Sequence, residues 1–363
     1  MSLTGFHKLR VQKLVKETKD AVCISFKIPF DLKESFNFIP GQYLTLRTTA
    51  IEEDLRRCYS IYSMPGDDLI SVAVKKLPGG RFSTWANEQL IVGDELEVMA
   101  PNGTFLHYCS TAEDEHYLCV AAGSGITPIL SIVQTILETE LTNRVTLVFG
   151  NQKASTILFR QKLEQIKNRF IDRFQMIHVL SRESRDVPAL DGRINSEKLM
   201  ALTPNLFDLK TVSKTFICGP EALINEVSNG LKESGLNEEE IYYELFGTSN
   251  LLGQAAVTNV SASLADVGNR SVVTLIVDGR HVRLEVGSNG KSILDSALDV
   301  NLDLPFACKG GVCGTCRAKV VKGDVRMDSQ SVLSVTDVEK GAVLTCRAHP
   351  VSAEVFINFD KAL

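Results

Sequence analysis

The sequence predicts a multidomain protein: an antiparallel β-barrel, then a doubly wound α/β domain with a parallel sheet, then a small α+β domain. Three observations predict this order. The chain has 363 residues, too many for one ordinary domain. The spacing of strand and helix patterns changes near residue 110, and four cysteines are grouped towards the C-terminal end. The 44% of hydrophobic and 23% of charged residues are proportions typical of globular domains.

The barrel is expected over residues 1–110. In this segment short β-type runs such as VCISFKI, QYLTLRT, LISVAVKKL and ELEVMA are separated by the turn signals PG, PGDD and PGG. Short strands at close, regular spacing are typical of a small antiparallel barrel, because each tight turn reverses the chain onto its neighbour.

The α/β domain is expected over residues 111–246, where strand patterns alternate with helical ones. YLCVAAG precedes PILSIVQTILETE, and VTLVFG precedes ILFRQKLEQIKNRF. This alternation predicts βαβ units on a parallel sheet. Residues 247–270 are rich in Gly, Ser, Thr and Asn and are interpreted as a linker, either flexible or packed as an ordered connection.

The last domain is expected over residues 271–363. It opens with VVTLIVDGRHVRLEV, which predicts two strands around an Asp278-Gly279 hairpin turn, and the helical stretch KSILDSALDV follows. Next comes C-x4-C-x2-C-x29-C, formed by Cys308, Cys313, Cys316 and Cys346. This spacing is that of a plant-type [2Fe-2S] cluster. A zinc site is the alternative, although zinc sites usually have two C-x2-C pairs.

Charge and the N-terminal sequence limit the classes of protein. The net charge of -5 is spread along the chain without a basic block, which argues against a nucleic-acid partner. The opening MSLTGFHKLRVQKL has no apolar signal region, and nowhere do 18 apolar residues follow one another. We therefore expect a cytoplasmic enzyme that has no membrane partner.

A flavin site is predicted in the barrel by RRCYSIYSMP and the later PGGRFSTW. An arginine can neutralise a phosphate, a tyrosine can stack on the isoalloxazine, and a serine can hydrogen-bond near N5. Backbone amides after the glycine pair could hold a pyrophosphate. The residues concerned are Arg57, Tyr59, Ser60, Gly80, Arg81, Phe82 and Ser83. Taken alone, the first motif also fits an exposed arginine and a half-buried tyrosine.

A nucleotide site is predicted at the ends of the parallel strands. In CVAAGSGITPIL, a strand ends in a glycine turn that opens a helix, and the amides there can bind phosphate. A simple strand-to-helix turn explains the same letters. FICGP ends another strand and places a cysteine where it could touch a nicotinamide, although buried cysteines usually serve packing. The residues concerned are Gly123, Ser124, Gly125, Thr127, Cys218, Gly219 and Pro220.

The choice of nucleotide depends on VLSRES. Ser181 and Arg182 end a strand, and a hydroxyl beside a guanidinium suits the 2′-phosphate of NADPH. An NAD site would more often place an acidic residue near the ribose. Glu183 follows directly, so a surface ion pair with Arg182 is the alternative.

In this order the motifs resemble the ferredoxin-NADP reductase superfamily, specifically oxygenase reductases with a C-terminal ferredoxin domain, over essentially the whole chain. The resemblance implies FAD in the barrel, NADPH in the α/β domain and a β-grasp ferredoxin at the end. It implies a catalytic role for Ser60, Cys218 and Glu244, with Phe246 stacking on a ring, although a linker here follows where that family ends on an aromatic residue. It also adds, as neighbours of the flavin, Cys58, Ile61, Ala73, Val74 and Lys76.

The resemblance further implies that electrons pass from NADPH through FAD and the cluster to a separate oxygenase. The implied acceptor is the di-iron phenylacetyl-CoA 1,2-epoxidase of phenylacetate catabolism, with a steroid hydroxylase or an acyl desaturase as the alternative. Lys309, Arg317 and Lys319, near the cluster, are candidates to meet an acidic oxygenase surface. An alternative from a different functional class is a redox-sensing or carrier module whose flavin barrel is vestigial. The intact set of Arg57, Tyr59 and Ser60 argues against this alternative.

Overall fold

The computed structural model describes residues 5–51, 54–185, 187–203, 205–245, 270–277, 279–329 and 332–361. The chain divides into two compact units, one within His7–Phe246 and the other within Gly247–Leu363 with the N-terminal residues. The larger unit holds the barrel and the parallel sheet, and the smaller one holds the cysteine motif. Of the expected linker, residues 247–269 lie outside the described part of the chain.

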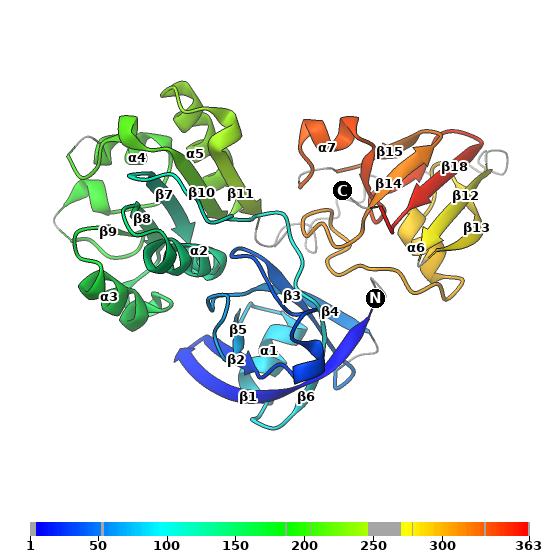
Figure 1. Cartoon of the computed structure of the whole chain (residues 1–363), viewed down its shortest axis with the longest axis horizontal. Coiled ribbons are helices and arrows are strands. Elements are labelled where there is room, and N and C mark those ends of the chain that lie inside the picture. Colours follow the sequence, from blue (N-terminus) through cyan, green and yellow to red (C-terminus); the bar gives the residue numbers. More distant parts are fainter. Residues whose placement is uncertain are drawn as a thin grey trace. The chain divides into compact units, whose positions relative to one another are not determined.

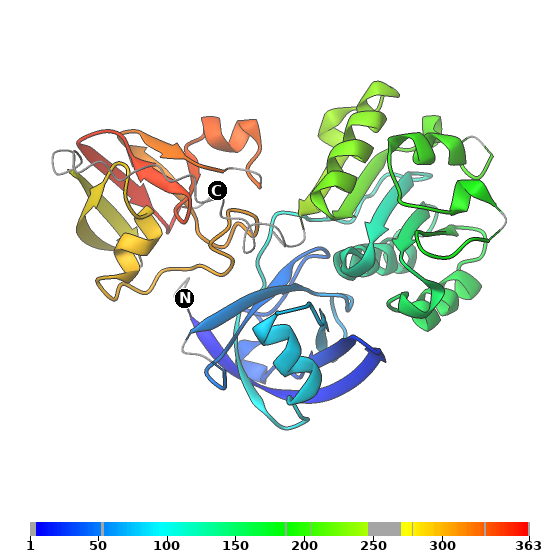
Figure 2. The same cartoon turned by 180° about the vertical axis from the view of Figure 1, so that it is seen from behind.

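The barrel is one six-stranded sheet in the order β4-β3-β6-β1-β2-β5. Its strands are β1 (Phe6–Thr18), β2 (Ala21–Phe26), β3 (Tyr43–Thr48), β4 (Leu55–Ser60), β5 (Ile70–Lys75) and β6 (Glu95–Met99). An antiparallel bridge between Ile61 and Val72 brings the two edge strands together and closes the barrel. Helix α1 (Arg81–Glu88) packs against β5 and β2, and it is drawn in cyan in Figure 2.

Strand β1 is a difference from the expected pattern, in which the first strand was VCISFKI. Its sequence, FHKLRVQKLVKET, carries many charged side chains, and only Leu9 and Val11 are fully buried. The strand forms because β2 pairs with it in antiparallel register over Val11–Thr18. Long-range pairing, which a local pattern does not reveal, therefore places this segment in the sheet.

The α/β domain contains a five-stranded parallel sheet in the order β11-β10-β7-β8-β9 (Figure 1). The strands are β7 (His116–Ala122), β8 (Arg144–Asn151), β9 (Phe174–Leu180), β10 (Lys214–Gly219) and β11 (Ile241–Leu245). Helices α2 (Ile126–Thr139) and α3 (Arg160–Arg169) pack on one face of the sheet, with strand residues such as Tyr117 and Cys119. Helices α4 (Ser196–Leu202) and α5 (Glu221–Glu233) pack on the other face, with the alternate strand residues such as Leu118 and Val120. The predicted doubly wound domain is confirmed.

The smaller unit has a mixed five-stranded sheet in the order β13-β12-β18-β14-β16, with β12 and β18 parallel at its centre. Its strands are β12 (Arg270–Val277), β13 (Arg280–Gly287), β14 (Arg317–Lys322), β16 (Ala342–Leu344) and β18 (Glu354–Asn358). Strands β15 (Val325–Met327) and β17 (Ala348–Pro350) form a second, two-stranded sheet, and the helices are α6 (Ile293–Leu298) and α7 (Val335–Glu339). Val277 pairs with Arg280 across the predicted hairpin turn.

No helix in the described ranges is both long enough and apolar enough to cross a membrane.

Candidate functional site

The predicted flavin residues of the barrel lie on β4 and at the start of α1. Arg57 is exposed on β4, and Tyr59 is half-buried with its ring 5.4 Å from the ring of Phe82. Burial raises the pKa of the Tyr59 hydroxyl, so this side chain is neutral at any ordinary pH. Tyr59 thus presents a neutral aromatic ring, which suits stacking on a flat cofactor.

The start of α1 has the form of a phosphate site. Gly80 is the N-cap and has no side chain to satisfy the first amides of the helix. The Ser83 hydroxyl accepts a hydrogen bond from the Leu77 amide at 3.1 Å and donates to the Gly80 carbonyl at 3.2 Å. Ser83 therefore shapes the turn, and backbone amides at the N-terminus of a helix are groups that suit a pyrophosphate.

The remaining predicted flavin neighbours have structural partners. Ile61 and Val74 are fully buried in the barrel core, and Ala73 packs in the core shared with α2. Cys58 contacts the Thr45 hydroxyl, and Lys76 forms a salt bridge with Glu88 that fastens α1 to the end of β5. These contacts give each of them a role in the packing of the barrel or of α1.

The glycine turn connects β7 to α2 through Gly123–Gly125. A Cβ on Gly125 would lie 2.1 Å from the Cys218 carbonyl oxygen, so only glycine allows the turn to approach β10 this closely. Gly123 has a φ of +56°, the left-handed region that favours glycine. Thr127 is buried and donates to the Ser124 carbonyl at 3.0 Å, which stabilises the turn from within.

Three predicted catalytic residues meet beside this turn. Cys218 is the second-last residue of β10 and is paired in register with Glu244 on β11. The Ser60 hydroxyl of β4 donates to a Glu244 carboxylate oxygen at 3.3 Å, although the two residues are 184 positions apart. The carboxyl ends of parallel strands thus meet the barrel at one place. Gly219 ends β10 with Cys218, and Pro220 is the N-cap of α5.

Burial favours the uncharged forms of Glu244 and Cys218 at this meeting point. Burial raises the pKa of Glu244 to about 8, while the hydrogen bond from Ser60 acts in the opposite direction. Burial, with a smaller effect of the Glu244 charge, raises the pKa of the Cys218 thiol well above its usual range. Glu244 can therefore hold a proton at neutral pH, which a carboxyl in water cannot do.

Ser181 and Arg182 directly follow β9. Their amides donate to the carbonyls of Asn151 and Gln152 at 2.9 Å each, which holds the end of β9 beside that of β8. The Arg182 side chain is exposed. The Glu183 carboxylate accepts from the Ala154 amide at 2.8 Å. The Glu183 carboxylate is thus bound by a backbone amide of the segment that follows β8. This contact disfavours the alternative in which Glu183 forms an ion pair with Arg182.

Lys75 was not among the predicted residues, whereas its neighbour Lys76 was. The Lys75 ammonium lies 3.8 Å from the position that a Cβ on Gly123 would take. A cation at the glycine turn suits a bound phosphate. The strand period could have found it, because adjacent residues of β5 point in opposite directions. Phe246 lies outside the described residues.

The four motif cysteines form two interacting pairs. Cys308 interacts with Cys313, and this hydrogen bond, together with burial, raises the pKa of the Cys308 thiol. Cys316 interacts with Cys346, and the hydrogen bond between them raises the pKa of Cys316 and lowers that of Cys346. The two pairs also interact electrostatically, because charge on Cys313 raises the pKa of Cys316 and charge on Cys308 raises that of Cys346. Two thiolates for each of two irons is the donor set that a [2Fe-2S] cluster requires, so the residues present fit this group.

Two of the cations proposed for docking are already paired. Lys309 contacts Asp295 at 2.9 Å, and Arg317, whose side chain is 11% exposed, contacts Asp337 at 2.6 Å. The Arg317 pair joins β14 to α7, and the docking role of Lys309, Arg317 and Lys319 stays a prediction.

Family models match all three predicted domains. Residues 8–107 match an oxidoreductase FAD-binding domain, residues 119–229 an oxidoreductase NAD-binding domain, and residues 275–351 a 2Fe-2S iron-sulfur cluster binding domain. The predicted binding of a flavin, a nicotinamide nucleotide and an iron-sulfur cluster is thereby confirmed.

Relatives match the chain over nearly its full length. It is 41% identical over 360 residues to a subunit of the 1,2-phenylacetyl-CoA epoxidase of Escherichia coli strain K12, and the match covers 99% of both chains. It is 30% identical over 353 residues to the ferredoxin reductase component of 3-ketosteroid-9-alpha-monooxygenase from Rhodococcus rhodochrous, covering 97% of this chain and 96% of the relative. The solved structure of phthalate dioxygenase reductase has the same fold, with a TM-score of 0.57, 21% identity and 98% of each chain covered.

Proposed function

This chain belongs to the FAD- and [2Fe-2S]-containing reductases of multicomponent oxygenases, and from that premise we propose that it draws electrons from NADPH and supplies them to a phenylacetyl-CoA epoxidase. The observation that carries the proposal is the meeting of Ser60, Cys218 and Glu244 beside the glycine turn. When bound, FAD accepts a hydride from the nicotinamide and releases electrons singly to the cluster. The reaction is proposed for the cytoplasm, and the five cysteines outside the cluster motif, which form no disulfide, fit such a reducing compartment.

The residues around the meeting point would bind and orient the reacting rings. Tyr59 and the start of α1 suit the flavin, and the turn at Gly123, with Lys75 beside it, suits the nucleotide pyrophosphate. Glu244 would hold a proton at its carboxyl, within hydrogen-bonding distance of Ser60 Oγ. Holding the two rings in one geometry is the main contribution that the protein makes to hydride transfer.

The preference for NADPH is proposed from Ser181 and Arg182. Steady-state kinetics with NADPH and NADH test it in the wild-type chain and in Arg182→Gln. Loss of one charge-assisted phosphate contact should raise the KM for NADPH roughly tenfold and leave that for NADH unchanged. A wild-type preference for NADH, or equal changes for both nucleotides, would remove the assigned role.

The epoxidase partner is proposed from the 41% identity to a subunit of the Escherichia coli epoxidase. The test adds this chain to purified epoxidase components that lack their own reductase and follows consumption of phenylacetyl-CoA with NADPH. The same assay with a 3-ketosteroid-9-alpha-monooxygenase that lacks its reductase is the comparison. Faster turnover with the steroid enzyme would overturn the assignment of the partner while leaving the reductase activity intact.

A further inference from the structure

Arg347 directly follows the fourth cysteine of the motif, on the segment between β16 and β17. Its backbone is held from both sides. The Arg347 amide donates to the Leu344 carbonyl at 2.8 Å, and the Arg347 carbonyl accepts from the Asp328 amide at 2.9 Å. The side chain therefore leaves the backbone from a fixed point beside the cysteine motif.

The stem of Arg347 packs on the loop that carries the first three cysteines. A Cβ on Gly311 would lie 2.9 Å from Arg347 Cγ and 3.4 Å from Ser329 Oγ. A side chain at position 311 would thus have to displace the arginine, and glycine leaves room for it. The Arg347 stem therefore lies directly against the loop between Cys308 and Cys313.

Two groups of this region favour negative charge on the Cys346 sulfur, in addition to its hydrogen bond with Cys316. The Gly311 amide donates a hydrogen bond to this sulfur, and the Arg347 guanidinium acts on it through its charge. Arginine stays protonated in proteins, so this charge is constant. One side chain thus brings a permanent cation near the fourth ligand and packs on the loop whose amide binds the same sulfur.

The Arg347 charge has no counter-ion among the residues that the structure describes, whereas its cationic neighbours do. Lys309 pairs with Asp295, and Arg317 pairs with Asp337. Arg347 Nε is buried and has no hydrogen-bond partner within the same ranges. A buried donor of this kind calls for an explanation, and an anionic group bound beside the loop supplies one.

A cation held at this place has a consequence for an iron-sulfur cluster. A [2Fe-2S] group with four thiolates carries two negative charges when oxidised and three when reduced. Reduction adds one electron and converts one Fe(III) to Fe(II), with no bond made or broken. A fixed positive charge stabilises the more negative form more strongly, and so it raises the reduction potential.

We propose that Arg347 raises the reduction potential of the cluster through its charge and thereby makes the cluster a better acceptor of electrons from the flavin. The inference goes beyond the proposed function, because it depends on the bound cluster and on neither the nucleotide nor the oxygenase. The competing role is packing alone, in which the stem supports Gly311 and the charge has no effect. A side chain that keeps the length and loses the charge separates the two roles.

The test is a redox titration of the full-length chain with its cluster, with dithionite and mediators, followed by electron paramagnetic resonance of the reduced cluster. Arg347→Gln and Arg347→Met keep most of the stem without the charge. Each should lower the equilibrium constant for cluster reduction roughly tenfold, which is about 59 mV for a one-electron couple. Arg347→Lys keeps a cation and should retain most of the wild-type potential. Arg280→Gln removes the same net charge from an exposed position at the start of β13 and is the matched control.

Iron content and the visible circular dichroism of the cluster show whether each variant holds it. Wild-type potentials in the Gln and Met variants would overturn the proposal, as would an equal drop in the Lys and Met variants, since neither result is expected of a charge effect. A control that shifts as far as Arg347→Gln would show that net charge, and not this position, sets the potential. Loss of the cluster from all three Arg347 variants would overturn the proposal too, because the shape of the guanidinium would then be what matters.

Discussion

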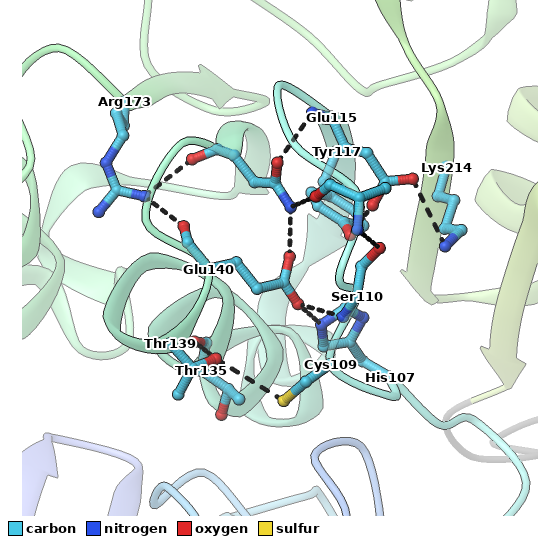
Figure 3. A network of polar contacts seen from close by, with 12 residues as sticks. His107, Cys109, Ser110, Glu115, Tyr117, Thr135, Thr139, Glu140, Arg173 and Lys214 are labelled. Atoms are coloured by element: carbon cyan, nitrogen blue, oxygen red, sulfur yellow. Dashed lines mark hydrogen bonds and ion pairs between the residues drawn. The ribbon is translucent and has the colours of Figure 1, made fainter.

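Two carboxyl groups of the larger unit have opposite electrostatic environments. Burial opposes ionisation of Glu140, but hydrogen bonds from His107, Asn143 and the Ser110 amide outweigh it and lower the pKa of this carboxyl to about 2. Figure 3 shows the His107 ring and Ser110 directed at one carboxylate oxygen. Among the described residues Glu244 has the Ser60 hydroxyl as its hydrogen-bond partner, so burial dominates and its pKa rises to about 8. The number of donors decides which residue is charged.

Glu140→Gln is expected to lower the free energy of unfolding of the larger unit at pH 7 by about 3 kcal/mol. The neutral amide of glutamine cannot form the charge-assisted hydrogen bonds that the ionised carboxylate forms. Because the carboxyl pKa is lower in the folded chain than in the unfolded chain, the ionised carboxylate stabilises the fold at any pH above the unfolded-state pKa of about 4.5. This stabilisation is lost as the pH falls from there towards 2. The difference between wild type and variant should therefore shrink over that window in urea titrations. Glu138→Gln, in an exposed pair with Arg169, is the control and should change stability little.

Glu244→Gln is expected to change the dependence of stability on pH in the opposite sense. A raised carboxyl pKa means that the folded state keeps its proton while the unfolded chain loses it above about pH 4.5. Wild-type stability should therefore fall as pH rises from about 4.5 to 8, by roughly 2 kcal/mol after allowing for solvent screening. Urea midpoints at pH 5, 7 and 9 should show a flatter profile in the variant. Parallel profiles would refute the buried, protonated state of Glu244.

At the scale of elements, the site depends on how closely strand ends and turns approach. The turn Gly123–Gly125 packs against the end of β10, and the parallel register places Ala121, Cys218 and Glu244 side by side across three strands. A side chain at the point of closest approach would separate the turn from β10. The geometry of the nucleotide site is therefore set by backbone contacts.

Gly125→Ala is expected to destabilise the larger unit by about 3 kcal/mol, because a Cβ 2.1 Å from a backbone oxygen forces strands apart. Nucleotide binding should be lost with it. Gly123→Ala is the matched comparison. Its Cβ would meet only the Lys75 ammonium at 3.8 Å, and the positive φ should cost about 1 kcal/mol. Urea titration and NADPH binding measure both effects, and equal losses in the two variants would contradict the close-approach explanation.

At the scale of the whole molecule, the two units have separate cores. The core of the smaller unit contains Cys316 and Cys346 and residues from β12, β14 and β18. Within the larger unit, the barrel and the α/β domain are joined by direct hydrogen bonds. Ser131 and Gln134 of α2 donate to the carbonyls of Ser63 and Tyr62 at 2.7 and 3.0 Å, and the Phe159 amide donates to Glu17 at 2.8 Å.

Cys308→Ser is expected to remove the cluster and lower the unfolding temperature of the smaller unit alone. Calorimetry should show a separate transition for each unit, with only one of them shifted, because a bound metal group stabilises the unit that holds it. Bleaching of the flavin by NADPH should continue at the wild-type rate, while supply of electrons to an oxygenase should stop. A shift of both transitions would show that the cores are coupled.

Local patterns predicted the parts of the molecule whose geometry is local. The cysteine spacing, the turn at the end of β7 and the order of the three domains were all visible in the sequence. Helices α1 and α4 and strand β1 were missed: only two residues of β1 are fully buried, and its pairing partner, not its own pattern, places it in the sheet. The predicted residues included Lys76 and not Lys75. The alternation of side chains along a strand separates two adjacent lysines, and the fold shows that the Lys75 ammonium is the one near Gly123.

By itself, the sequence determined the cofactor classes, since each motif joins its chemical groups within a few residues. Only the tertiary structure decided that Ser60 and Glu244, 184 positions apart, share a hydrogen bond, and that Lys76 and Arg317 are committed to salt bridges. It alone brought the ring of Phe82 into contact with the rings of both Tyr59 and Trp85. The physical reason is that burial and distance set pKa values and contacts, and both depend on segments that meet only when the chain is folded.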